Sequence, residues 1–168
     1  DEEIGLLGAK KIDFSKFPVD FAYTIDCCEL GEVVYETFNA GGATLKIKGV
    51  TAHPMSSKGV LVNPTLVAVD FINMLDRGAT PEFTENTEGF VWVNAMQSTP
   101  SQATVSLKIR DHNREKYEAK KAQIAAAVEY LKVRHPRAEL ELTISDVYGN
   151  IADAVRDENR ICIDHLYR

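Results

Sequence analysis

The spacing of hydrophobic residues changes along this chain between two periods, and these changes mark out the predicted elements. A period of two, with polar residues in between, is typical of a strand with one buried face. The β-branched and aromatic composition of residues 20–26 predicts a short strand, and the period of two predicts further strands at residues 33–49, 90–96, 103–110 and 138–147. Gly41-Gly42 interrupts the second of these stretches and favours a bulge or bend there.

A period of three to four residues predicts two helices. The first begins at Asn63-Pro64, because asparagine caps free backbone N–H groups and proline is tolerated in the first turn, and Gly78 can end it. Its apolar face comprises Val67, Phe71, Met74 and Leu75. The second begins at Asn113 and ends near His135-Pro136, because the residue before a proline avoids the helical region. Its apolar stripe comprises Tyr117, Ile124, Val128 and Leu131.

The predicted order over residues 36–148 is strand, helix, strand, strand, helix, strand. This order favours an α+β fold, a four-stranded antiparallel sheet with both helices on one face. We expect residues 36–148 to form one domain, and residues 1–35 and 149–168 to be pieces of a second one. The chain lacks a starting Met, and the helical pattern of residues 150–168 has no closing Gly or Pro, so both ends are interpreted as cut.

Composition and charge narrow the possible partners. With 45% hydrophobic and 26% charged residues the chain is typical of a soluble globular domain. A net charge of -6 argues against a nucleic-acid partner. No apolar run approaches the roughly 18 residues that span a membrane, and the acidic start is unlike a signal peptide. Three cysteines, an odd number, favour a reduced, cytoplasmic setting.

Acidic residues near the start of the chain are candidates for metal chemistry. Adjacent carboxylates such as Glu2 and Glu3 can divide their work, one as a metal ligand and one as a proton carrier for metal-bound water. Asp26 could supply another ligand from the end of its predicted strand. On composition alone, a solvated acidic loop and a turn-forming aspartate are the commoner interpretations.

Two basic side chains lie where they could face a ligand. His53 follows a predicted strand in a segment of loop composition, where a neutral imidazole could face a ligand. Arg110 ends the outward face of another strand, and a guanidinium there could bind a carboxylate through two hydrogen bonds. The alternatives are an exposed loop histidine and a local ion pair between Arg110 and Asp111.

Several short segments carry a family resemblance through their order along the chain. They are Asp-Glu-Glu-Ile-Gly (1–5), Gly-Ala-Lys-Lys (8–11), Val-Asp-Phe-Ala-Tyr-Thr-Ile-Asp (19–26), Phe-Asn-Ala (38–40), His-Pro (53–54) and Ile-Arg-Asp (109–111). Over nearly its whole length the chain resembles the tripeptide aminopeptidases of the peptidase T family, which are co-catalytic zinc exopeptidases.

The resemblance implies a catalytic α/β domain interrupted by an inserted sheet-and-helix domain, the lid, through which two copies form a homodimer around a peptide substrate. On this mapping Glu2 resembles the general base for a zinc-bridging water, and Glu3 and Asp26 resemble ligands of the two zinc ions. His53 resembles the lid histidine that stabilises the oxyanion in a partner subunit's site. Arg110 resembles the lid arginine that holds the peptide's carboxylate.

Other metal ligands of this family lie outside the present stretch. Because a catalytic zinc usually has three protein ligands, we expect this chain alone to bind no zinc and to be inactive. Cys27-Cys28 stand where the family often has glycine after the ligand aspartate. A related dipeptidase or acyl-amino-acid amidohydrolase and a non-catalytic binding module remain alternatives, because a fold does not fix a function.

Overall fold

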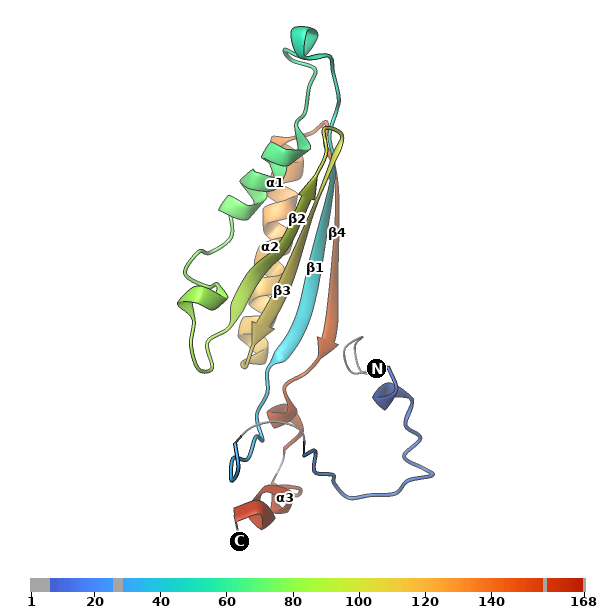
Figure 1. Cartoon of the computed structure of the whole chain (residues 1–168), viewed down its shortest axis with the longest axis vertical. Coiled ribbons are helices and arrows are strands. Elements are labelled where there is room, and N and C mark those ends of the chain that lie inside the picture. Colours follow the sequence, from blue (N-terminus) through green and yellow to red (C-terminus); the bar gives the residue numbers. More distant parts are fainter. Residues whose placement is uncertain (1–6, 26–28, 156, 168) are drawn as a thin grey trace. The chain divides into compact units, whose positions relative to one another are not determined.

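The computed structural model describes residues 7–25, 29–155 and 157–167. The chain divides into two compact units, Thr37–Asn150 on the one hand and Asp1–Glu36 with Ile151–Arg168 on the other. The Thr37–Asn150 unit contains the sheet and the two long helices that Figure 1 labels. It therefore carries most of the regular structure.

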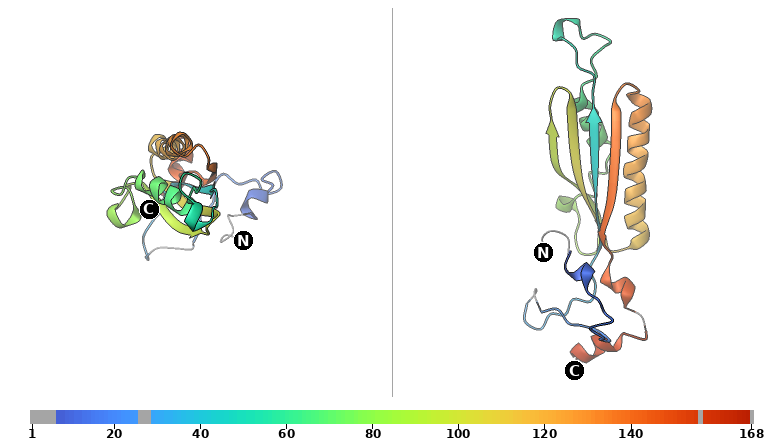
Figure 2. Two further views of the ribbon diagram at one scale, coloured as in Figure 1. Left: turned by 90° about the horizontal axis from the view of Figure 1, so that it is seen from above. Right: turned by 90° about the vertical axis from the view of Figure 1, so that its right-hand side faces the viewer.

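An antiparallel sheet of four strands, in the order β2-β3-β1-β4, forms the Thr37–Asn150 unit (Figure 2). The strands are β1 (Asn39–Lys48), β2 (Phe90–Ser98), β3 (Gln102–Asp111) and β4 (Glu139–Tyr148). Helices α1 (Pro64–Asn73) and α2 (Arg114–Arg134) cover one face (Figure 1). The predicted α+β order is confirmed.

The core lies between the sheet and the helices. On β3, Val105, Leu107 and Ile109 are buried on the helix side, and the residues between them belong to the open face. All four residues of the predicted α2 stripe are buried, which confirms the helical period read from the sequence.

Both long helices begin at the predicted caps. The side-chain oxygen of Asn63 accepts a hydrogen bond from the N–H of Thr65 at 3.0 Å, and that of Asn113 accepts one from Lys116 at 2.9 Å. The prediction that the first helix continues toward Gly78 was wrong. It ends at Asn73, because the N–H of Met74 turns back to the Phe71 carbonyl at 3.1 Å and tightens the last turn.

Two strand predictions need correction. Residues 20–25 form no strand, and the extended stretch predicted from residue 33 becomes a strand only at Asn39. A strand is held by a ladder of backbone hydrogen bonds to a neighbouring strand, and residues 20–25 and 33–38 belong to none of the four strands of the described sheet. The β-branched and aromatic composition there was therefore not sufficient.

The regular structure of the second unit, as far as its residues are described, is short. It comprises the 3₁₀ turns Ala9–Lys11, Ile151–Ala154 and His165–Tyr167 and the short helix α3 (Ile161–Asp164). The hydroxyl of Tyr23 donates to the Cys162 carbonyl at 2.7 Å and links the unit's two segments. In the part of the chain that the structure describes, no helix has the length and apolar character required to span a membrane.

Candidate functional site

Three of the five candidate residues lie outside the described part of the chain. These are the carboxylates Glu2, Glu3 and Asp26. The structure therefore places only the two basic candidates, His53 and Arg110.

His53 lies on an excursion of the chain, residues 51–61, between β1 and α1. A pair of backbone hydrogen bonds between Val50 and Val62, at 3.1 and 2.9 Å, closes its base. The excursion extends beyond the end of the sheet (Figure 1). His53 is exposed and caps the 3₁₀ turn Pro54–Ser56.

The hydrogen bond that His53 makes determines which nitrogen of its neutral ring carries the proton. Its Nδ1 accepts from the backbone N–H of Met55 at 3.3 Å, so the neutral ring carries its proton on Nε2. No bond of Nε2 is seen within the described residues. The imidazole therefore presents one N–H donor to an external acceptor, as an oxyanion requires.

Arg110 lies at the opposite end of the sheet, on the open face of β3. Its Nη1 donates to two backbone carbonyls, those of Gly41 at 3.0 Å and Ile109 at 2.8 Å. The guanidinium carbon lies 5.4 Å from the centre of the Phe38 ring, within the range of a cation–π contact. The ion pair with Asp111 that the sequence allowed does not form, because the Asp111 carboxylate faces Lys120 instead.

Buried polar groups support the Arg110 end of the sheet. The Asp111 carboxylate accepts hydrogen bonds from Lys120 Nζ at 2.7 Å and from the N–H of Asn113 at 2.9 Å. Asn39 and Asn150 are buried beside it, and both side-chain amides donate to the carbonyl of His112. The sequence indicated no role for Asn39, Asn150 or Lys120, and the pairing of Asn39 with Asp111 across β1 and β3 brings Asn39 to this cluster.

On the helix side of the same end, the hydroxyl of buried Tyr117 donates to the carboxylate of Asp146 at 2.5 Å. This bond, with a second from Lys121, holds the pKa of Asp146 below its usual range. Burial and the same carboxylate raise the pKa of Tyr117. The pair therefore stays as a neutral phenol and an ionised carboxylate at neutral pH.

His53 and Arg110 are too far apart to contact one small ligand within a single copy. Arg110 pairs with Ala40, and β1 continues from there for eight residues to Lys48, about 26 Å at ~3.3 Å per residue. His53 lies five residues further along the chain. In a tripeptide, the carboxylate and the first peptide carbonyl are only about 7 Å apart.

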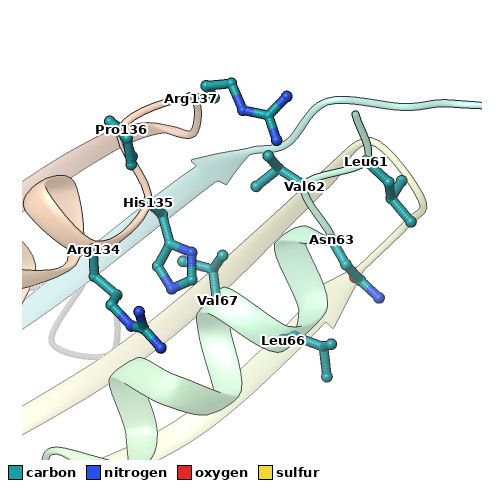
Figure 3. Close-up of a pocket in the computed structure, with 9 residues that line it drawn as sticks. All are labelled: Leu61, Val62, Asn63, Leu66, Val67, Arg134, His135, Pro136 and Arg137. Atoms are coloured by element: carbon teal, nitrogen blue, oxygen red, sulfur yellow. The ribbon is translucent and has the colours of Figure 1, made fainter. Parts of the chain in front are cut away.

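A pocket of about 430 Å³ lies between the start of α1 and the end of α2 (Figure 3). Leu61, Val62, Leu66 and Val67 give it an apolar lining, and Arg134 and Arg137 lie around it. Its lining includes neither His53 nor Arg110. It is therefore separate from the candidate functional residues.

Metal binding is not supported by the described residues. Within 7–25, 29–155 and 157–167, no group of three histidine, cysteine or acidic side chains converges as a metal site requires. These residues therefore do not fit a zinc ion by themselves.

Comparison with known proteins assigns most of the chain to a known domain family. Residues 35–136 match the family described as the peptidase dimerisation domain. The chain is 50% identical over 167 residues to a peptidase T-like protein of Yersinia pestis, covering 99% of this chain and 40% of that protein. It is 40% identical over 157 residues to peptidase T of Fusobacterium nucleatum, covering 94% and 38%.

A solved structure, that of the aminopeptidase PepT from Bacillus cereus, has the same fold. The TM-score is 0.74 at 21% identity, over 89% of this chain and 40% of that one. The class is thus an α+β domain of a sheet covered on one face by two helices. The chain belongs to the peptidase dimerisation domain family, and its resemblance to the peptidase T family is confirmed. It spans about 40% of the length of these relatives.

Proposed function

We propose that this chain is the lid and dimerisation part of a zinc-dependent aminopeptidase that releases the N-terminal residue from tripeptides. The longer parent protein would hold two zinc ions, which supply an activated water, with Glu3 and Asp26 among their ligands and Glu2 as the base. Residues 36–148 would form the lid, and residues 1–35 and 149–168 would belong to the catalytic domain. The free thiol of Cys162 supports a reducing, cytoplasmic setting.

One observation carries this proposal: His53 and Arg110 lie at opposite ends of one sheet, about 26 Å or more apart along the strands. If both contact one tripeptide, they must come from different copies. A two-fold axis supplies this arrangement when two sheets pair edge to edge in antiparallel fashion, because it inverts one sheet relative to the other. The His53 end of one copy then lies at the Arg110 end of its partner.

The free edge of β2 is the surface we propose for this pairing. Its first part is covered, since the N–H of Val91 donates to the carbonyl of Ala79 at 2.9 Å. The part from Asn94 to Ser98 is exposed. An uncovered edge invites another strand. At the other edge, α2 runs along the β4 side of the sheet (Figure 2).

Apolar surface near β2 supports the same choice. Met96 on β2 and Leu66 and Val69 on α1 are large hydrophobic residues that remain exposed in a single copy. The Thr65 hydroxyl donates to that of Ser98 at 3.1 Å, so α1 begins at the end of this strand. Exposed apolar groups beside an open sheet edge are typical of an interface between copies.

Complementation between two inactive variants of the parent tests the proposal. In a mixed dimer of His53→Ala and Arg110→Ala subunits, one of the two sites receives an intact Arg110 from its own subunit and an intact His53 from the partner. Random assortment makes half of the dimers mixed, so about a quarter of wild-type activity should return. Each variant alone should be nearly inactive.

The control is Lys58→Ala, an exposed change on the same excursion, which should keep wild-type activity. If co-expression of the two inactive variants yields mixed dimers but restores no activity, the site is not shared between subunits. Comparing di- and tripeptide turnover then separates a tripeptidase from the related dipeptidase and amidohydrolase alternatives. Equal or better turnover of dipeptides or acyl-amino acids would refute the tripeptide assignment.

A further inference from the structure

The Arg110 guanidinium uses only one of its nitrogens to hold itself in place. Both carbonyl acceptors, on Gly41 and Ile109, bind Nη1. For Nε and Nη2 the described part of the chain supplies no hydrogen-bond partner. These two nitrogens form the edge of a guanidinium that binds a carboxylate through two parallel hydrogen bonds. The direction of that edge depends on where the Gly41 carbonyl lies.

Gly41 occupies an irregular place in β1. The pairing of β1 with β4 shifts register between Ala40 and Gly41, so the backbone is not fixed there by a regular ladder on both sides. A side chain at this position would point to the helix face. Its Cβ would overlap the hydroxyl of Tyr117 and lie 2.8 Å from the carbonyl oxygen of Ser145.

Tyr117 fills the space that the glycine leaves. Its side chain is buried, with 1% of the residue exposed, and its hydroxyl donates to Asp146 Oδ1 at 2.5 Å. Lys121 holds the same carboxylate through hydrogen bonds of 3.0 and 3.3 Å. The hydroxyl therefore has a fixed position against the backbone of Gly41.

From these contacts we infer that Tyr117 is a positioning residue for Arg110 and acts through the backbone of Gly41. The Tyr117 hydroxyl abuts Gly41 from the helix side, and Arg110 binds the carbonyl of the same residue. A fixed carbonyl fixes Nη1, and the planar guanidinium then presents Nε and Nη2 in one direction. This inference rests on the proposed role of Arg110 as the group that binds a peptide carboxylate.

Removal of the hydroxyl should loosen the carbonyl without removing the guanidinium. In Tyr117→Phe, the ring remains buried but loses its bond to Asp146. The Nε and Nη2 edge of the Arg110 guanidinium then samples several directions, and it binds the substrate carboxylate more weakly. We expect KM to rise about three- to tenfold for a substrate with a free carboxylate, with little change in kcat, because a small misplacement of a binding group costs such factors.

The experiment compares two substrates of the parent protein, a tripeptide with a free C-terminal carboxylate and the same tripeptide as its C-terminal amide. Wild type should prefer the free acid, and Arg110→Ala should abolish the preference. Tyr117→Phe should reduce it by raising KM for the acid alone. The matched control is Val128→Ala, a buried change on the same helix that loses stability away from Gly41 and should keep the full preference.

The outcomes distinguish failure of the positioning role of Tyr117 from failure of the proposed role of Arg110. A loss of preference in Arg110→Ala together with full preference in Tyr117→Phe overturns the positioning role and leaves the proposed function standing. Equal losses for acid and amide in Tyr117→Phe also overturn it, since they indicate a purely structural role. An unchanged preference in Arg110→Ala overturns both the carboxylate role of Arg110 and the inference built on it.

Discussion

The backbone N–H of Asn150 donates a hydrogen bond of 3.3 Å to the side-chain oxygen of Asn39, a residue 111 positions earlier in the sequence. The amide nitrogen of Asn39 donates in turn to the carbonyls of Asp111 and His112, at 3.1 and 3.3 Å. The start and the end of the Thr37–Asn150 unit are thus joined to the end of β3. This buried cluster closes the sheet at the end that carries Arg110.

Asn39→Ala should therefore destabilise the unit strongly. The change removes the three hydrogen bonds that the buried Asn39 side chain makes with Asp111, His112 and Asn150, which costs about 2–4 kcal/mol in the free energy of unfolding. Urea unfolding of the chain measures it. Asn73→Ala, an exposed change at the end of α1, is the control and should cost less than about 0.5 kcal/mol. Similar values for the two variants would contradict the structural role of the cluster.

Two of the ion pairs that involve sheet residues should differ in their contribution to the free energy of unfolding. The Asp111 side chain is 1% exposed and that of Lys120 is 17% exposed, so Asp111→Ala leaves a nearly buried ammonium without its partner and costs about 3–5 kcal/mol. Lys48 and Glu139 are 67% and 75% exposed, and Glu139→Ala should cost less than about 1 kcal/mol. Denaturant titration of both variants checks the order, and a reversed order would refute it.

Acid should weaken the contact between Tyr117 and Asp146. The bond from Tyr117 lowers the pKa of Asp146 below its unfolded value of 3.8. The carboxylate therefore contributes its full stability above pH 3.8 and loses it as the pH falls through the lower folded pKa. Thermal unfolding from pH 6 down to pH 2 should show a steeper loss for wild type than for Asp146→Asn. Parallel curves would count against the pair.

Local signals in the sequence predicted most of the fold. The α2 stripe and the two asparagine caps depend on neighbours within one or two turns, and the structure confirms them. The strand at 20–26 was predicted from composition, and residues 20–25 form no strand. A strand needs a neighbouring strand, which composition does not reveal. The place of Arg110 at the end of β3 could be predicted because apolar and polar residues alternate along that strand.

The supports of the candidate site could not be predicted in this way. Nothing near Tyr117 in the sequence indicates that its hydroxyl lies against Gly41, and nothing near Asp111 indicates that Lys120 pairs with it. These contacts exist because the register of β1 with β3 and β4 brings the residues together. One signal was available: a glycine pair inside an alternating strand indicates close approach by another group.

Pairing of two copies through β2 is the central claim, and one spin-label distance tests it most directly. Thr143 on β4 is exposed and lies in one row across the sheet with Thr44, Ser106 and Ala95, close to the middle of the free β2 edge. A label at Thr143→Cys is introduced after the three native cysteines are replaced by serine.

In a dimer of the parent joined at β2, seven strand spacings separate the two labelled positions, about 34 Å at ~4.8 Å each. Pulsed electron–electron dipolar spectroscopy should therefore show one distance near this value. A separation of only about 5 Å between the labelled positions, as pairing through β4 would give, or no dipolar coupling at all, would contradict the account.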